Sequence, residues 1–235
     1  MPLRDLFRSA VDREDFSWSS FYSTWPTFMV VDLNHHLPEG YAGGPRVYTA
    51  GSSDSDSTQF VFNPDLAFEW PEGSWDPGHP TWHGRSPRPD LDQYSVRIRN
   101  LGRQRFVAAI ELVSPGHKRN PATRTAFVAR CAVALRDGLS VTIVDTVADS
   151  AANFLNELLR FVGYPEATGL PSSPTYAVTC RWLHNHAKGR LETWAHPLEI
   201  GSPLPTLPVW LAYDIAIPLD LEATYEETCK LLRIR

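Results

Sequence analysis

The sequence predicts an α/β fold: a single domain whose mixed sheet contains a central parallel βαβ unit. Two nearly continuous apolar runs, Arg105–Val113 and Ser140–Asp145, are typical of strands that are covered on both faces. Between them, Asn120 is a good N-cap, Pro121 suits the first helical position, and Gly138 stands just past the expected end. Strands joined by a helix with short links pair in parallel, so these three observations predict the unit.

The chain before this unit predicts a helix and a short strand. Thr24 can cap the helix, and Pro26 is tolerated in a first turn because the amide groups there have no helical partners. Pro38 and Gly40 then end the helix. A short strand is expected at Val47–Ala50.

Residues 51–90 form the least regular part of the sequence. They contain a serine-aspartate run, many Pro and Gly residues, and several tryptophans. Loops of this length are uncommon in compact domains and are often functional. We therefore expect a long irregular excursion, which would be the contact surface of a binding module. No repeat or linker divides the chain, so residues 1–235 are assigned to one domain.

The remaining elements follow from local periodicity. Alternating residues predict a half-exposed strand before the central unit, and paired apolar runs predict a hairpin after it. The helix of the central unit, residues 121–137, should pack on one face of the sheet. The other predicted elements are a strand at Tyr94–Arg99, a helix at Asn153–Val162, hairpin strands at Thr175–Trp182 and Leu191–Leu198, an extended segment at Leu204–Ala212, and a helix at Leu221–Leu232.

Composition limits the class of protein. The net charge of −5 argues against a general nucleic-acid coat, since phosphate contacts dominate such binding, but it leaves room for a local basic cleft. The three cysteines are far apart and in no CxxC spacing, which argues against disulfides and zinc-thiolate sites. No apolar leader or membrane-length run occurs. A soluble, cytoplasmic protein with no membrane partner is expected, and an even-numbered homo-oligomer is compatible with the sequence.

Glu111 stands near the end of a run that is otherwise apolar. A turn at residues 114–116 follows it, and His117, Lys118 and Arg119 come next. Two interpretations remain open. Glu111 belongs to a functional site, or it forms a buried structural salt bridge with Lys118 or Arg97. The turn is likewise either an anion site or a plain turn, and the plain turn is favoured.

The functional interpretation is a nuclease site that holds Mg²⁺ or Mn²⁺. Such a site needs two or three oxygen ligands and a nearby cation. Glu111 would be one metal ligand, and Asp90 or Asp92 would supply the second. Lys118 would hold the phosphate or a water molecule, with Arg124 as the reserve cation. Nucleic acid would then be the partner. The histidine pairs 79/83 and 184/186 have no carboxylate or cysteine at ligand spacing and are weaker metal candidates.

Several of these segments resemble domain-of-unknown-function family 4058. The central similarity is FVAAIELVSPGHKR at 106–119, the helix after it and the strand SVTIVD. LPEGYAG at 37–43, PLPTLPVWLAYD at 203–214 and LDLEATYEE at 219–227 are also similar. The family provides no assigned chemistry, so this resemblance implies membership and a shared fold without naming a reaction.

The central strand is also similar to that of restriction-endonuclease-like proteins of the PD-(D/E)xK superfamily. That similarity implies a mixed sheet flanked by helices and a metal-dependent phosphodiester hydrolase. The sequence departs from both patterns. Val113 stands where the nuclease motif has Lys, and Ile143 stands where family 4058 has a second acid. The alternative is therefore a non-catalytic binding or scaffold module with a degenerate nuclease-like core, and the assignment as an enzyme stays open.

Overall fold

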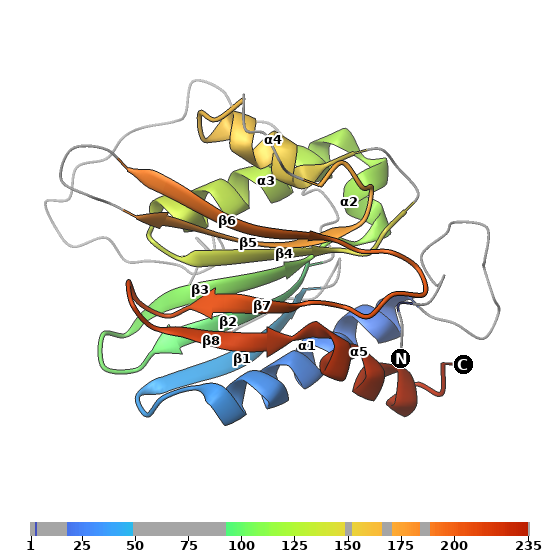
Figure 1. Cartoon of the computed structure of the whole chain (residues 1–235), viewed down its shortest axis with the longest axis horizontal. Coiled ribbons are helices and arrows are strands. Elements are labelled where there is room, and N and C mark those ends of the chain that lie inside the picture. The colour runs from blue at the N-terminus through green and yellow to red at the C-terminus, as the bar shows by residue number, and fades with distance from the viewer. Residues whose placement is uncertain are drawn as a thin grey trace, which may run out of the picture.

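The computed structural model describes residue 3 and residues 18–48, 93–148, 152–165, 171–183 and 189–234. Within these ranges the chain forms helices on two sides of a twisted sheet (Figure 1). The elements in chain order are α1 (Trp18–His36), β1 (Tyr41–Tyr48), β2 (Gln93–Asn100), β3 (Arg105–Leu112), α2 (Pro115–Arg119), α3 (Pro121–Arg136), β4 (Ser140–Asp145), α4 (Phe154–Phe161), β5 (Tyr176–Leu183), β6 (Arg190–Pro197), β7 (Thr206–Trp210), β8 (Ala216–Asp220) and α5 (Leu221–Leu231).

The main sheet has six strands in the order β1-β2-β3-β4-β5-β6. β3 and β4 are parallel, with Glu111 opposite Ile143, and all the other neighbouring strands are antiparallel. The predicted mixed sheet with a central parallel βαβ unit is therefore confirmed. The predicted hairpin is β5 and β6. The restriction-endonuclease-like core stays a prediction.

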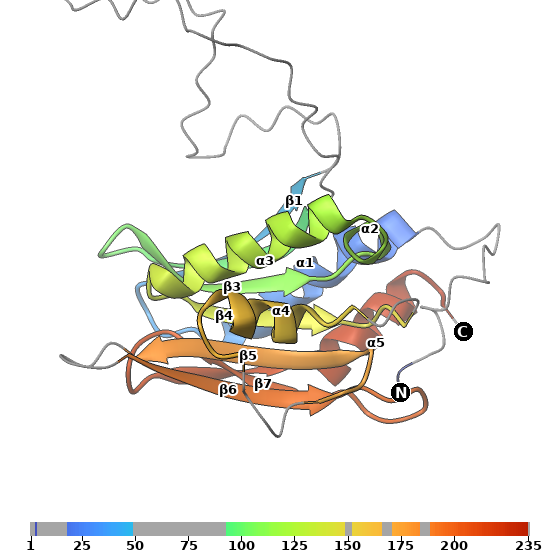
Figure 2. The ribbon, with the colours of Figure 1, turned by 90° about the horizontal axis from the view of Figure 1, so that it is seen from above.

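The sheet separates two hydrophobic clusters. Ile143 belongs to the cluster under α3 and α4, and its neighbour Val144 belongs to the cluster that α1, α5 and the two-stranded β7–β8 sheet cover. Successive strand residues point to opposite faces, so a strand buried on both faces needs apolar residues at every position. Figure 1 shows α3 and α4 on one side of the strands and α1 and α5 on the other, and Figure 2 looks down on the side with α3 and α4.

Both ends of α3 have the capping residues that the sequence predicts. The side chain of Asn120 accepts a hydrogen bond from the backbone N–H of Ala122 at 2.9 Å. Gly138 has a φ of +83°, a conformation in which a side chain would be strained. Phe127, Cys131 and Leu135 form the buried stripe that packs α3 on one face of the sheet, as expected.

The beginning of the chain differs from the sequence prediction. α1 starts at Trp18 rather than Thr24, so Pro26 lies inside the helix. The side chains of Phe21, Tyr22 and Trp25 are buried, and their packing favours a helix that extends past the local cap signal. Tertiary burial therefore outweighs the capping preference here.

Three other predictions need correction. β1 begins at Tyr41 rather than Val47, and it tolerates Gly and Pro because it is the edge strand. The predicted turn at 114–116 opens the short helix α2. β8 was not predicted at all. The excursion at 51–90 lies outside the described residues, and no described helix has the length and apolar content needed to cross a membrane.

Candidate functional site

Glu111 lies near the end of β3, and two arginines hold its carboxylate. Oε1 accepts from Arg97 Nη2 on β2 at 2.6 Å, and Oε2 accepts from Arg130 Nη2 on α3 at 3.2 Å. The Glu111 side chain is 1% exposed. The predicted salt bridge with Arg97 is confirmed, whereas Lys118, the other predicted partner, pairs elsewhere.

The two arginines stabilise the negative charge of Glu111. Burial by itself raises the pKa of this carboxyl, but the charges and hydrogen bonds of Arg130 and Arg97 outweigh it and hold the pKa below its ordinary value. The Gln93 amide oxygen, in the orientation that suits its donors, accepts from the Arg130 guanidinium. The acid is therefore an ionised carboxylate clamped between cations.

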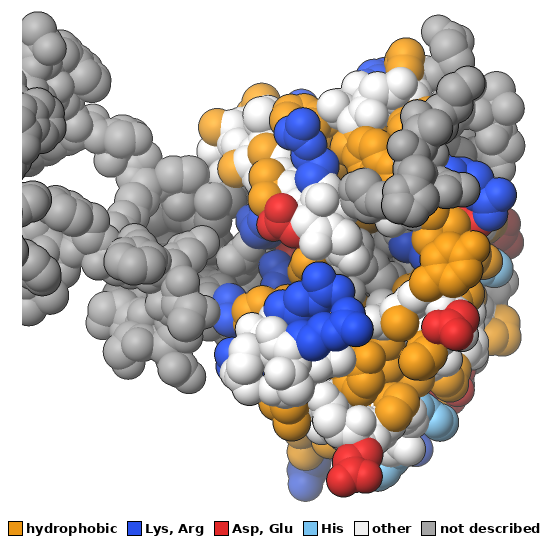
Figure 3. Space-filling model, turned by 90° about the vertical axis from the view of Figure 1, so that its left-hand side faces the viewer, with side chains coloured by type: hydrophobic (Ala, Val, Ile, Leu, Met, Phe, Trp, Pro, Cys, Tyr) orange, Lys and Arg blue, Asp and Glu red, His pale blue; other side chains and the backbone are white. Residues whose placement is uncertain are grey.

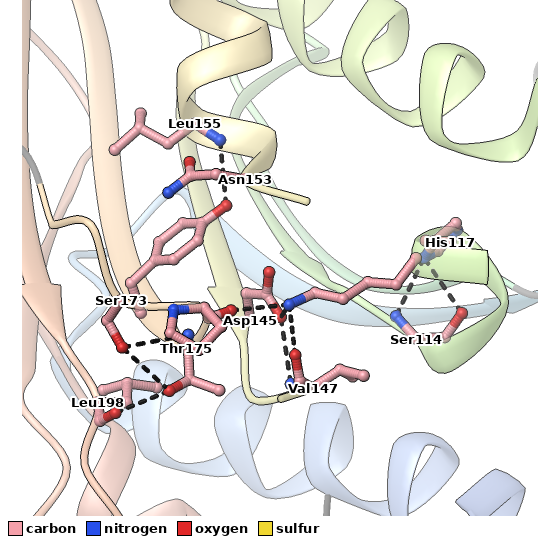
Figure 4. Close-up of polar contacts among 12 residues, drawn as sticks. Ser114, His117, Asp145, Val147, Asn153, Leu155, Ser173, Thr175 and Leu198 are labelled. Atoms are coloured by element: carbon pink, nitrogen blue, oxygen red, sulfur yellow. Dashed lines mark hydrogen bonds and ion pairs between the residues drawn. The ribbon is translucent and has the colours of Figure 1, made fainter. Parts of the chain in front are cut away.

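Lys118 extends from α2 to the end of β4. Its Nζ lies 3.0 Å from Asp145 Oδ1 and donates to the carbonyls of Val147 and, at 2.7 Å, Pro174. Figure 4 shows these contacts converging beside Asp145. Both side chains are fully buried. Burial raises the pKa of Asp145 to about 7, although Lys118 and the Val147 N–H lower it in part.

His117 lies on α2 between Lys118 and the helix start. Its Nδ1 accepts from the Ser114 N–H at 3.0 Å and lies 3.1 Å from Ser114 Oγ (Figure 4). The ring packs on Phe127 of α3. Burial, aided by the charge of Arg130, lowers the pKa of His117 to about 4. The imidazole is therefore neutral near pH 7, and its buried Nε2 has no hydrogen-bond partner in the described part of the chain.

A second group of hydrogen bonds connects α4 to β5. Tyr176 Oη accepts from the N–H of Leu155 at 3.0 Å, and Asn153 caps α4 by accepting from the Asn156 N–H. Thr175 donates to the Leu198 carbonyl at 2.7 Å. Figure 4 shows these contacts in the segments next to Asp145. They are structural contacts, and they support the position of the Lys118 acceptors.

The structure separates the predicted site residues. Lys118 pairs with Asp145 rather than facing Glu111, and Arg124 Nε lies 3.4 Å from Glu157 on α4. Asp90 and Asp92 lie outside the described residues, as do the histidines of both predicted pairs. Within the described ranges, no group of three His, Cys, Asp or Glu side chains could hold a metal ion.

Two candidate residues of the site, Arg130 and Asp145, were not predicted from the sequence. Arg130 stands three positions after Phe127 on α3, so it projects over the same region as the buried stripe, and that spacing could have indicated it. Asp145 is the last residue of β4, which is buried at every position. Glu111 is the second-last residue of the neighbouring parallel strand β3. An acid at the same end of both central strands was the available signal.

The molecular surface bears on the nucleic-acid prediction. Figure 3 shows that Lys and Arg side chains on the viewed face are interspersed with hydrophobic and acidic ones. A nonspecific nucleic-acid binder would instead present a continuous basic surface. This face therefore gives no support to general phosphate-backbone binding.

Comparison with known proteins adds no relative. No family model matches the chain, no curated protein matches it, and no solved structure matches it. The resemblances to family 4058 and to the PD-(D/E)xK superfamily therefore stay predictions.

Proposed function

We propose that this protein is a non-catalytic binding module with a degenerate nuclease-like core. The observation that carries the proposal is the double clamp on Glu111, in which each carboxylate oxygen accepts from a different guanidinium. A divalent metal requires oxygen lone pairs and negative charge at its site. Here Arg97 and Arg130 occupy those oxygens and leave the cluster positive.

Lys118 supports the same proposal. A catalytic lysine must present its ammonium to a phosphate or a water molecule. Lys118 is buried, and Asp145 and two backbone carbonyls receive its hydrogen bonds. Its contacts tie α2 to the ends of β4 and β5, which is a structural role.

The competing proposal is the metal-dependent phosphodiester hydrolase. It keeps Glu111 as a ligand of Mg²⁺ or Mn²⁺, with Asp90 or Asp92 as the second ligand. In its favour, Glu111 lies near the end of a central parallel strand, where α/β sheets usually keep their sites. For that mechanism, the metal would have to displace both guanidinium groups.

Calorimetry with Mg²⁺ and Mn²⁺ separates the two proposals. A binding module gives no saturable heat with either metal, and it cleaves single- or double-stranded DNA no faster than Glu111→Gln does. Glu111→Gln keeps the size of the side chain and removes its charge. If Mn²⁺ binds and Glu111→Gln abolishes both binding and cleavage, the non-catalytic proposal is wrong.

Membership of family 4058 and the restriction-endonuclease-like core are part of the same proposal. They rest on the residue patterns at 106–119 and 140–145, which form β3, α2 and β4. A cytoplasmic location and a homo-oligomeric state are further expectations. Light scattering after size-exclusion chromatography tests the oligomeric state directly.

A further inference from the structure

The cluster around Glu111 carries excess positive charge. Arg97 and Arg130 contribute two positive charges, Glu111 contributes one negative charge, and His117 is neutral near pH 7. Within the described residues, the ion pairs of both arginines go to Glu111 alone. A partly buried positive charge without a counter-ion is unfavourable, so the cluster favours an added anion.

Three buried donor groups in this cluster have no hydrogen-bond partner among the residues that the structure describes. They are Arg97 Nη1, Ser95 Oγ and His117 Nε2. Ser95 pairs directly with Glu111 across β2 and β3, and successive even steps along β2 place Arg97 on the same face. Native proteins rarely leave buried donors unpaired, so each such group calls for an explanation. A shared acceptor would explain all three.

The two arginine side chains of this cluster lie nearer to solvent than its acid. Glu111 is 1% exposed, whereas the side chains of Arg97 and Arg130 are 14% and 23% exposed. The guanidinium groups therefore reach from the carboxylate toward the surface. An anion would therefore contact the exposed parts of the guanidinium groups first, and it would reach the buried donors only after these groups move aside.

We propose that the Arg97–Glu111–Arg130 cluster binds a phosphate group. Guanidinium forks match phosphate oxygens in a bidentate arrangement, and hydroxyl and imidazole N–H donors complete such sites. The proposal rests on the non-catalytic binding function, because it requires Glu111 to remain paired with the arginines. It names the ligand chemistry that the module recognises. The phosphate belongs to a small molecule or to the end of a nucleic acid.

Binding assays with different phosphate probes distinguish these sources. Isothermal titration calorimetry would use inorganic phosphate, a nucleoside 5′-monophosphate, and one single-stranded oligonucleotide with and without a 5′-phosphate. Saturable binding of the first two probes supports the proposal. Tighter binding of the 5′-phosphorylated oligonucleotide than of its unphosphorylated form assigns the site to nucleic-acid ends. Equal binding of both oligonucleotides, with none of inorganic phosphate, overturns the proposal.

Two variants each remove one of the three donors without breaking the Arg97–Glu111–Arg130 cluster. Ser95→Ala deletes the hydroxyl, and His117→Asn keeps an acceptor near Nδ1 for the Ser114 N–H while deleting the Nε2 donor. Each should weaken phosphate binding by about tenfold or more, the usual effect of losing a hydrogen bond to a charged group. Both should fold normally, since the deleted donors make no hydrogen bond with any residue that the structure describes.

Matched controls exclude general effects. Thr146→Val removes another buried hydroxyl that has no partner within the described ranges, and Arg105→Gln removes an exposed positive charge at the opposite end of β3. Neither should change phosphate affinity more than about twofold, because surface charges act weakly across the sheet. Absence of saturable phosphate binding in the millimolar range overturns this inference alone. Glu111-dependent Mn²⁺ binding overturns both it and the non-catalytic function.

Discussion

Glu111 and Asp145 are buried acids near the same end of neighbouring parallel strands, yet their surroundings are opposite. Two guanidinium groups hold the pKa of Glu111 below its ordinary value, whereas burial raises the pKa of Asp145 to about 7 beside a single ammonium. Glu111 therefore stays charged in the folded state. Asp145 gains a proton near neutral pH. The number of cations within reach decides the difference.

Lys118→Met tests the structural role of the buried ion pair. The change leaves Asp145 enclosed without a cation, and breaking a buried pair in this way lowers the free energy of unfolding by about 3–5 kcal/mol. Urea denaturation at pH 8, followed by circular dichroism, measures the loss. The loss should shrink as the pH falls toward about 7 and stay constant below it, because without Lys118 the pKa of Asp145 is higher and the variant takes up the proton first.

The control for this prediction is Lys230→Met. Lys230 pairs with Glu227 on the exposed surface of α5, and such pairs contribute less than about 1 kcal/mol. If Lys118→Met proves as mild as Lys230→Met, the pair does not stabilise the fold, and Lys118 is again a candidate for the site.

His117 makes the stability of the folded protein depend on pH in the acidic range. Its pKa is about 4 in the folded state and about 6.5 when unfolded, so the unfolded chain binds more protons between these values. Its contribution to stability is complete above pH 6.5 and is lost as the pH falls through the window to 4. The shift corresponds to about 3 kcal/mol.

The difference between wild type and His117→Asn isolates this contribution. Asp145 acts with the opposite sign between about pH 4 and 7, because its folded-state pKa is raised, and Glu111 acts below about pH 4.5. Both are present in both proteins and cancel in the difference. The stability gap between the proteins should move in favour of the variant by about 3 kcal/mol from pH 7 to pH 4. A constant gap would contradict the lowered pKa.

At the scale of elements, sequence signals were reliable where they were local. The N-cap Asn120, the helical stripe of α3 and the Gly138 terminus depend on a few neighbouring residues, and each lies where it was expected. α1 and β1 depend on distant partners: Tyr22 stacks on Tyr94 of β2, and β1 pairs with β2. Those contacts shift the element boundaries, and no local pattern contains them.

Asn120→Ala tests the cap of α3. The change removes the acceptor for the Ala122 N–H and should lower the free energy of unfolding by about 1 kcal/mol. Thr125→Ala is the matched control on the exposed side of the same helix, where its Oγ1 bonds only to the Pro121 carbonyl. It should change stability by less than about 0.5 kcal/mol. Equal effects in a urea titration would show that the cap contributes nothing.

The difference between local and long-range contacts also explains how much of the candidate site was predictable. The sequence indicated Glu111 as an unusual acid and Arg97 as one possible partner. It did not indicate Arg130, nor the pairing of Lys118 with Asp145, because both contacts require the packing of helices on the sheet. The sequence therefore identified Glu111 and one of its two arginine partners, and the tertiary structure supplied the other.

At the scale of the whole molecule, the six-stranded sheet lies between the two hydrophobic clusters. Leu33 of α1 lies in one cluster and Leu158 of α4 in the other, and both are fully buried. Because β4 and β5 each contribute residues to both clusters, we expect the described elements to unfold together. Leu33→Ala and Leu158→Ala should each lower the free energy of unfolding by about 2–5 kcal/mol.

The same two variants test the prediction of a single domain. Tryptophan fluorescence and far-ultraviolet circular dichroism should give coincident urea midpoints in both, shifted together from wild type. Two separated transitions, with only one moved by each substitution, would indicate that the two faces unfold independently.

The hydrogen bond from Trp25 Nε1 to Thr224 Oγ1, 3.0 Å long, spans 199 positions of sequence. It belongs to a contact in which α5 covers the apolar side of α1. During synthesis at about 5–20 residues per second, Thr224 follows Trp25 by about 10–40 s. For that interval the nascent chain exposes Phe21, Trp25 and Met29 without their final cover. Newly made α1 is thus the segment we expect chaperones to bind on the ribosome, and its release coincides with the arrival of α5.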